Sequence, residues 1–84
     1  MIITCYKNDD VFKVYKIGQS IFNDEYRILV DNPRYQHKNA SIVDLDGNER
    51  LFSSRELAAE YVFNQIDKYM RIGQITNYEV SYKK

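Results

Sequence analysis

The sequence predicts an α+β fold in two layers, in which an antiparallel sheet of about five or six strands packs on one long helix at about residues 54–72. Three observations predict this class. Apolar residues recur at helical spacing between Ser53 and Gly73, short β-rich segments lie on both sides, and turn-forming residues separate them. No repeat or linker interrupts the 84 residues, so we expect a single domain at residues 1–84.

The N-terminal segment has the pattern of a β-hairpin. An apolar run at residues 2–6 and a β-rich run at residues 11–17 are separated by turn-forming residues at 7–10. Gly18 is expected to end the second strand and to begin a loop that extends to Asp24. Two apolar residues of this loop are expected to tuck under the helix or a sheet edge, because water disfavours them: Ile21 and Phe22.

The next segment predicts a half-buried strand at residues 25–31, where apolar and polar residues alternate. Pro33 is expected to stop this strand, because proline has no N–H to donate to a sheet. A polar, basic loop is expected at residues 34–39, and strand character resumes at residues 40–44.

The start of the helix is predicted from a turn and a cap. Asp46-Gly47 is a common tight-turn pair, and it leads into a short strand at residues 49–52. Ser53 and Glu56 have the spacing of a capping box, in which Ser53 is the N-cap. Phe52 and Leu57 stand at the two positions of a hydrophobic staple, so Leu57 is expected to be covered by Phe52.

The end of the helix is predicted at Gly73, which suits the left-handed conformation of a residue that follows a helix. Lys68 and Arg71 precede it, where the helix dipole favours cations. Alternation at residues 78–82 then predicts a final strand that returns alongside the others beneath the helix.

Composition narrows the class of protein. Twelve basic and twelve acidic residues cancel, so net charge does not draw the chain to nucleic acid or to a membrane. The single cysteine suits a reducing compartment, and without a leader or an apolar run that spans a bilayer we expect a cytoplasmic protein. Eight tyrosines are either a binding-surface signal or the mark of an A+T-rich gene. The composition and small size are typical of an accessory protein of a phage or other mobile element, which acts in the host cytoplasm.

The residue patterns of catalysis and metal binding are incomplete. His37 and Cys5 are the only histidine and cysteine, which is short of the four ligands of a zinc site. Residues 44–49 lack the glycine and glutamate spacing of a calcium loop, and the three glycines stand apart, so no phosphate-binding loop is present. We therefore expect a protein that is not an enzyme and uses no metal, cofactor or small-molecule substrate.

Two surfaces are candidates for partner binding. The loop at residues 31–39 combines charge, a ring and hydrogen-bonding groups in four residues: Arg34, Tyr35, His37 and Lys38. The other interpretation of this segment is an ordinary solvated loop. On a helical wheel, the apolar side is wider than one sheet requires, and the excess consists of Tyr61 and Ile72. These two are expected to be covered by the Ile21-Phe22 loop, by a partner, or by a second copy of the chain.

The unit at residues 44–63 contains a strand, an Asp-Gly turn, a strand that ends in Phe, and Ser-x-x-Glu-Leu-Ala-x-x-Tyr. It resembles the hairpin and helix of AP2-like domains, including the amino-terminal arm-binding domains of phage integrases. The resemblance covers less than a third of the chain, and it implies a three-stranded sheet, backed by one helix, whose basic and aromatic residues read DNA. The nucleic-acid-binding residues would then be Arg27, Arg34, Tyr35, Lys38 and Arg50.

The predicted function is that of a non-enzymatic binding protein that inhibits a bacterial defence protein by binding and occluding it, for example an anti-CRISPR protein. The expected partner is a bacterial protein, such as a nuclease or its nucleic-acid complex. One alternative is a small DNA- or RNA-binding domain of the AP2-like kind. The other is a structural homodimer built on Tyr61 and Ile72, which is compatible with either function.

Overall fold

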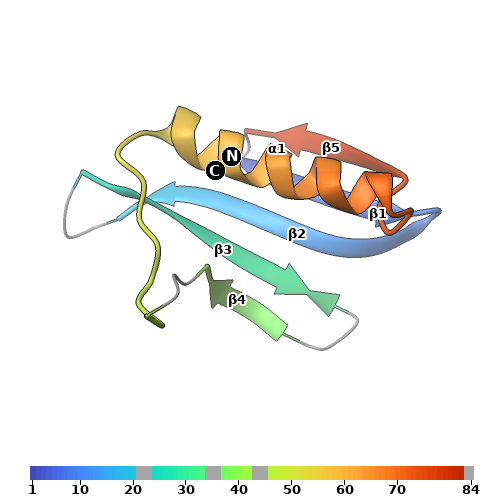
Figure 1. Cartoon of the computed structure of the whole chain (residues 1–84), viewed down its shortest axis with the longest axis horizontal. Coiled ribbons are helices and arrows are strands. Elements are labelled where there is room, and N and C mark those ends of the chain that lie inside the picture. The colour runs from blue at the N-terminus through green and yellow to red at the C-terminus, as the bar shows by residue number, and fades with distance from the viewer. Residues whose placement is uncertain (21–23, 34–36, 43–45, 83–84) are drawn as a thin grey trace.

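The chain forms a five-stranded antiparallel sheet and one α-helix (Figure 1). The computed structural model describes residues 1–20, 24–33, 37–42 and 46–82. The elements in chain order are β1 (Ile2–Lys7), β2 (Asp10–Gln19), β3 (Tyr26–Asn32), β4 (His37–Ser41), α1 (Arg55–Arg71) and β5 (Asn77–Ser81). The strands lie in the order β4-β3-β2-β1-β5, and each neighbouring pair is antiparallel. The predicted α+β class, with an antiparallel sheet and a helix, is confirmed.

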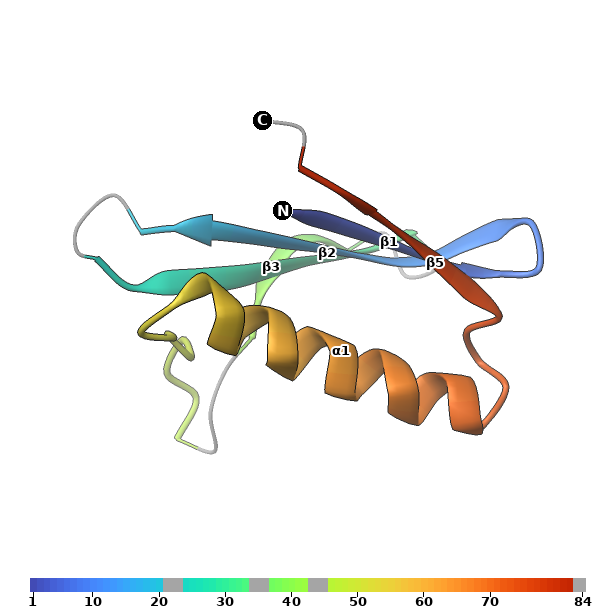
Figure 2. The ribbon, with the colours of Figure 1, turned by 90° about the horizontal axis from the view of Figure 1, so that it is seen from above.

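The helix lies along one face of the sheet (Figure 2). Its buried side chains, Ala58, Val62 and Ile66, belong to one apolar core with residues of the sheet and the connecting segments: Ile3, Cys5, Tyr15, Ile17, Ile28, Val30, Phe52 and Ile75. The helix packs mainly on β2 and β3. On the same sheet face Ile3 and Cys5 of β1 are fully buried, whereas Tyr78 and Val80 of the edge strand β5 remain partly exposed.

The predicted β1–β2 hairpin is confirmed, and Asn8 in its turn has a positive φ of 57°. A register shift opposite Cys5 and Tyr6 makes Phe12 an extra residue in β2. Phe12 and the adjacent Lys13 both contact Tyr69 of α1. The prediction that Gly18 ends the second strand is wrong: β2 continues to Gln19, because Gly18 still pairs with Arg27 of β3.

Strand β3 has the predicted alternation, since Ile28 and Val30 are buried on the helix side. The predicted polar loop at residues 34–39 is wrong for its second half. Residues 37–39 belong to β4, which pairs with β3 from Asn32 opposite His37. Pairing to the β3 backbone gives this polar segment the hydrogen bonds of a sheet despite its weak strand propensity.

The predicted strand at residues 49–52 is wrong. Phe52 makes an isolated bridge with Tyr26 at the start of β3, and no named strand covers this segment. Gly47 has a φ of +83°, which agrees with the predicted turn at Asp46-Gly47. The predictions for Ile21 and Phe22 fall outside the described residues. The same holds for residues 43 and 44 of the strand predicted at 40–44.

The start of α1 lies one residue later than predicted, and its cap is Ser54 instead of Ser53. Ser54 has an extended backbone, and its Oγ accepts a hydrogen bond from the Leu57 N–H at 3.1 Å. The third helical residue is then Leu57, so Glu56 cannot complete a capping box. The predicted staple is also wrong: Phe52 packs against Tyr61, and Leu57 is 48% exposed.

The end of α1 is as predicted. Gly73 has a φ of +76°, its N–H donates to the Met70 carbonyl at 3.1 Å, and the Gln74 N–H donates to the Tyr69 carbonyl at 2.9 Å. These two bonds form a Schellman cap. The final strand is confirmed as β5, but it lies at the sheet edge next to β1 and not beneath the helix.

Within the described residues, no helix has both the length and the apolar character needed to cross a membrane.

Candidate functional site

The structure gives different outcomes for the residues predicted to bind a partner. Arg34 and Tyr35 lie outside the described residues, and the backbone places His37 and Lys38 in β4. Tyr61 lies in α1, and Ile72 is its C-cap residue. Because they are eleven residues apart, or about three helical turns, Tyr61 and Ile72 share one flank of the helix.

A shallow groove lies between this flank and the segment that precedes the helix. We call it the Arg50 groove, and its lining residues are Arg50, Phe52, Leu57, Glu60, Tyr61 and Asn64. The guanidinium carbon of Arg50 is 5.0 Å from the ring centroid of Tyr61 and 5.4 Å from that of Phe52. The two rings are 5.5 Å apart and tilted by 50°. A cation therefore rests on a pair of packed rings at cation–π distance.

Backbone hydrogen bonds position this cluster. The Phe52 N–H donates to the Tyr26 carbonyl at 2.8 Å, and the Tyr26 N–H donates to the Phe52 carbonyl at 2.7 Å. The Arg50 N–H donates to the Ile42 carbonyl at 2.7 Å. The segment that carries Arg50 and Phe52 is thus bonded to the sheet side while its side chains meet Tyr61 on the helix.

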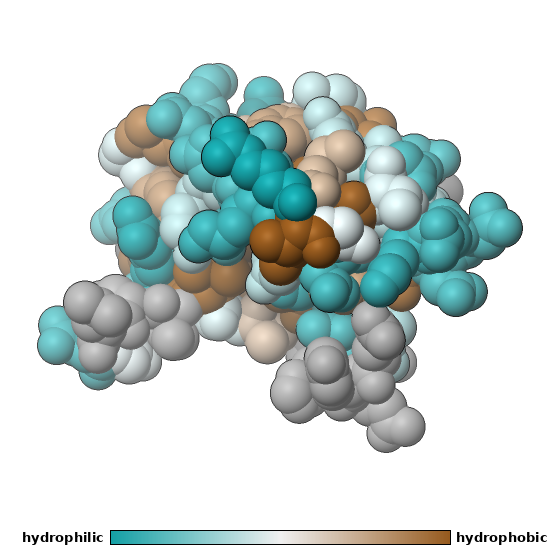
Figure 3. All heavy atoms as spheres, turned by 45° about the vertical axis from the view of Figure 1, so that its right-hand side comes forward, coloured by the Kyte–Doolittle hydropathy of each residue, from teal (hydrophilic) through white to brown (hydrophobic). Residues whose placement is uncertain are grey.

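The helix flank next to the groove exposes apolar side chains. Leu57, Tyr61, Asn64, Lys68 and Ile72 follow one another at intervals of three or four residues and therefore form one stripe. Leu57 is 48% exposed and Ile72 is 64% exposed. Figure 3, which brings the end of the molecule near the β1–β2 turn forward, shows apolar side chains as separate brown patches among hydrophilic ones.

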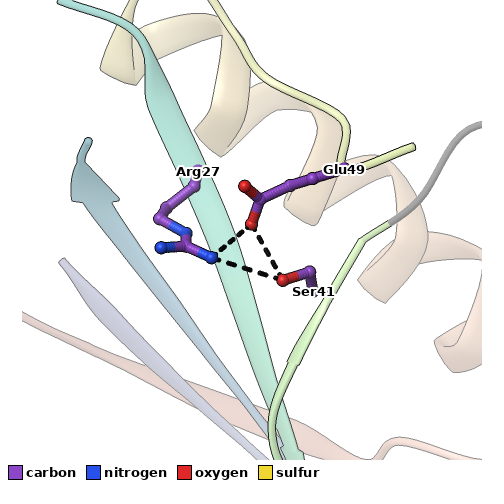
Figure 4. A network of polar contacts seen from close by, with 3 residues as sticks. All are labelled: Arg27, Ser41 and Glu49. Atoms are coloured by element: carbon purple, nitrogen blue, oxygen red, sulfur yellow. Dashed lines mark hydrogen bonds and ion pairs between the residues drawn. The ribbon is translucent and has the colours of Figure 1, made fainter. Parts of the chain in front are cut away.

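Arg27, a residue of the nucleic-acid-binding alternative, belongs to a polar network (Figure 4). Its guanidinium forms an ion pair with Glu49 and donates a hydrogen bond to the Ser41 hydroxyl at 3.4 Å. The Ser41 hydroxyl donates to the same Glu49 carboxylate at 2.8 Å. The network links β3, β4 and the segment before α1, so Arg27 and Glu49 have a structural role in holding these elements together.

A second cation beside Arg27 is also matched by a carboxylate. Lys16 of β2 forms a 2.8 Å ion pair with Asp31 of β3. A surface that contacts phosphates needs cations whose charge is available to the backbone of the nucleic acid. On the described part of the sheet, Arg27 and Lys16 both have acidic partners, which weakens this face as a phosphate-binding surface.

Two titratable side chains of the described core, Cys5 and Tyr15, have raised pKa values. Burial raises the pKa of the Cys5 thiol to about 11, and the nearby Lys13 opposes this shift only in part. Burial also raises the pKa of Tyr15. Lys13 lies 4.5 Å from the Tyr69 ring centroid and donates to the Tyr69 hydroxyl at 3.3 Å, so it holds α1 to β2. Among the described residues, no group of three or more His, Cys, Asp or Glu side chains is arranged to hold a metal ion.

The free edge of β5 is a surface that sequence reasoning missed. Tyr78, Val80 and Tyr82 are 41%, 39% and 69% exposed. Their alternation in the sequence predicts a strand beneath the helix, whereas the structure places this strand at the edge of the sheet. The edge position of β5 depends on strand order, which the alternation does not contain.

No protein-family model matches the chain, and neither a curated protein nor a solved structure matches it. The resemblance of residues 44–63 to AP2-like domains also lacks its structural counterpart here. Residues 46–52 do not form the second strand of a hairpin, and the sheet has five strands, two of which lie on the far side of β2 from that unit: β1 and β5.

Proposed function

We propose that the protein is a non-enzymatic binding protein that docks onto another protein through the Arg50 groove and the exposed residues of the same helix flank. The observation that carries this proposal is the stacking of Arg50 on the rings of Tyr61 and Phe52 at the protein surface. Arginine and tyrosine are strongly enriched among the residues that dominate binding energy. Because stacking already restricts the long Arg50 side chain, binding costs it less conformational entropy.

The chemistry of the groove suggests the partner residues that it accepts. Leu57 and the Tyr61 ring offer an apolar contact, and Arg50 offers a planar cation for a carboxylate. An apolar side chain next to an acidic residue on the partner would satisfy both. The proposed scaffold for this surface is the two-layer arrangement of the sheet and one long helix.

The partner class that we propose is a bacterial defence nuclease or its nucleic-acid complex, which the protein inhibits by occluding a working surface, as an anti-CRISPR protein does. Support for this class comes from the small size and the composition of the chain. The site of action is then the host cytoplasm. A protein surface is favoured over a nucleic acid because Arg27 and Lys16 are paired with carboxylates.

The experiment is to immobilise the protein and pass a panel of purified bacterial defence nucleases over it, CRISPR effectors among them. We expect at least one nuclease to bind and to lose activity. Arg50→Ala and Tyr61→Ala should each weaken that binding by about 2 kcal/mol, or about 30-fold.

The matched control is Arg55→Ala. Arg55 is also an exposed arginine of α1, but it lies about 160° around the helix from Leu57 and lines a different hollow, with Met1 and Tyr82. It should change affinity less than about twofold. The proposal fails if no nuclease is retained, or if Arg55→Ala weakens binding as much as Arg50→Ala. A salt-sensitive complex with DNA or RNA that forms without any protein partner would favour the nucleic-acid-binding alternative instead.

A further inference from the structure

The backbone of β5 is arranged to accept another strand. In the sheet formed by the described residues, β5 is the edge strand and β1 is its neighbour. Met1 and Ile17 exchange two backbone hydrogen bonds, of 3.1 Å from Met1 and 2.8 Å from Ile17. Alternate residues of an antiparallel strand direct their N–H and C=O groups to opposite neighbours. Odd-numbered residues of β1 therefore bond to β2, and even-numbered residues bond to β5.

The register between β1 and β5 then identifies the groups at the free edge. Ile2, Thr4 and Tyr6 lie opposite Ser81, Glu79 and Asn77, so these three β5 residues use their backbone groups on β1. The backbone groups of Tyr78 and Val80 point away from the sheet, and Tyr82 continues the same alternation. A row of outward N–H and C=O groups is a template for strand addition.

The side chains of this row are apolar and little covered. Tyr78 and Val80 lie opposite Cys5 and Ile3, whose side chains are in the core, so they belong to the helix face of the sheet. The Tyr78 ring is 5.8 Å from the ring of Phe63, on the side of α1 away from the Arg50 groove. Because α1 packs mainly on β2 and β3, this part of the face stays open to solvent.

The two edges of the sheet differ in how they resist strand addition. At the β4 edge, the pairing with β3 has a register irregularity. Irregular pairing discourages the addition of a further strand. Strand β5 pairs with β1 in one unbroken register, and its residues 77–81 include no lysine or proline.

We propose that two copies of the chain associate through antiparallel pairing of their β5 strands around a two-fold axis at Val80. In this register, Val80 faces Val80 of the second copy, Tyr78 faces Tyr82, and Glu79 faces Ser81. About six new backbone hydrogen bonds form, because the outward residues pair with one another. The Tyr82 ring of the second copy comes next to Tyr78 and extends its contact with Phe63.

The neighbouring register is less favourable. A shift that centres the axis on Glu79 keeps the same outward residues in contact, but it places two glutamates directly opposite each other, and like charges at such positions destabilise a sheet. The sequence of β5 is thus self-complementary around Val80. The Arg50 groove lies on the other flank of α1, so each copy of the dimer keeps its groove open, and the inference does not depend on the proposed function.

Sedimentation equilibrium at concentrations up to about 1 mM tests the association. We expect a concentration-dependent dimer. Val80→Lys puts two cations on the axis and should weaken dimerisation at least about tenfold. Ile72→Lys adds the same charge at a more exposed apolar residue away from β5 and should leave the dimer unchanged. A monomer at every concentration, or a dimer that survives Val80→Lys, would overturn the proposal.

Cysteine cross-linking tests the register in protein that retains its fold. In Val80→Cys the two α-carbons on the axis are about 5.5 Å apart, within the range that a disulfide spans, and oxidation should link the copies. In Glu79→Cys they are about 8 Å apart and should not link readily. The native Cys5 is fully buried, so it gives little background. Faster linking of Glu79→Cys than of Val80→Cys would refute the register.

Discussion

Replacing Ser54 by alanine is expected to destabilise the protein by about 1 kcal/mol, whereas Ser53→Ala should change the free energy of unfolding by less than about 0.5 kcal/mol. The two serines are adjacent and chemically identical, but it is the Oγ of Ser54 that accepts the cap bond, at 3.1 Å from the Leu57 nitrogen. Ser54→Ala removes the acceptor of that amide, while Ser53 is exposed before the helix begins. The pair therefore separates the cap in the structure from the capping box that the sequence predicts.

The magnitude follows from the surroundings of the cap. Ser54 is half-buried, so water replaces part of the lost hydrogen bond and the cost stays near the middle of the usual range. In a domain of this size, 1 kcal/mol lowers the melting temperature by about 4 to 8 °C. Ser54→Asp should keep most of the stability, because a carboxylate accepts the same bond at the positive end of the helix dipole.

Urea unfolding followed by far-UV circular dichroism measures these differences, and the slope of the transition should be the same in all variants. A cost for Ser53→Ala equal to or larger than that for Ser54→Ala would refute the assigned cap. It would show that the capping box of Ser53 and Glu56 forms after all.

Two further predictions concern the end of the helix and the buried thiol. Gly73→Ala should lower the free energy of unfolding by about 1 kcal/mol in a thermal or urea melt, because a φ of +76° strains any residue with a side chain. Gly18 lies in an extended strand and an added methyl group would meet open space, so Gly18→Ala should change the free energy of unfolding by less than about 0.5 kcal/mol. Equal costs for the two substitutions would contradict this account. Burial raises the pKa of Cys5 from 9.0 to about 11, so above pH 9 the thiol ionises more readily in the unfolded chain than in the folded protein. The contribution of Cys5 to the free energy of unfolding should therefore be fully present below pH 9 and should decline as the pH rises to about 11. Part of this decline should disappear in Cys5→Ala, and the rest should remain because burial also raises the pKa of Tyr15. If the wild-type protein and Cys5→Ala lose the same stability over this pH range, Cys5 makes no contribution to the decline.

The features that sequence predicts correctly are those with local causes. The helix and its end at Gly73 follow from apolar spacing and from one residue that tolerates a positive φ. The burial of Ile28 and Val30 follows from the two-residue period of a strand. Each of these signals lies within a few residues of the structure that it predicts.

The errors arise where tertiary pairing decides. Ser53 and Ser54 are equivalent as caps in sequence, and the helix start is displaced because Phe52 is bonded to Tyr26, far away in the chain. Residues 37–39 look like a polar loop, yet they pair with β3 as an edge strand. The backbone of a neighbouring strand can override weak strand propensity, and sequence patterns do not reveal which neighbour is available.

In the candidate site, too, the features with local sequence signals were predictable and those set by tertiary contacts were not. The helical wheel identified Tyr61 and Ile72 as apolar residues beyond the needs of the core, and Ile72 is indeed exposed. The contact of Arg50 with Tyr61 joins residues eleven positions apart through a non-helical segment, and the edge position of β5 depends on the order of all five strands. Neither arrangement has a local sequence signal.

The most direct test of the central claim, that the protein acts by binding and not by catalysis, is a stoichiometric titration of a retained nuclease. The account predicts that nuclease activity falls in proportion to added protein, reaches its end point near one chain per target molecule, and does not change with time of incubation. With nuclease at or below the dissociation constant, Arg50→Ala should raise the concentration of protein needed for half inhibition by about 30-fold. Complete inhibition by a small fraction of an equivalent, increasing with time, would show turnover and contradict the account, and so would undiminished inhibition by Arg50→Ala.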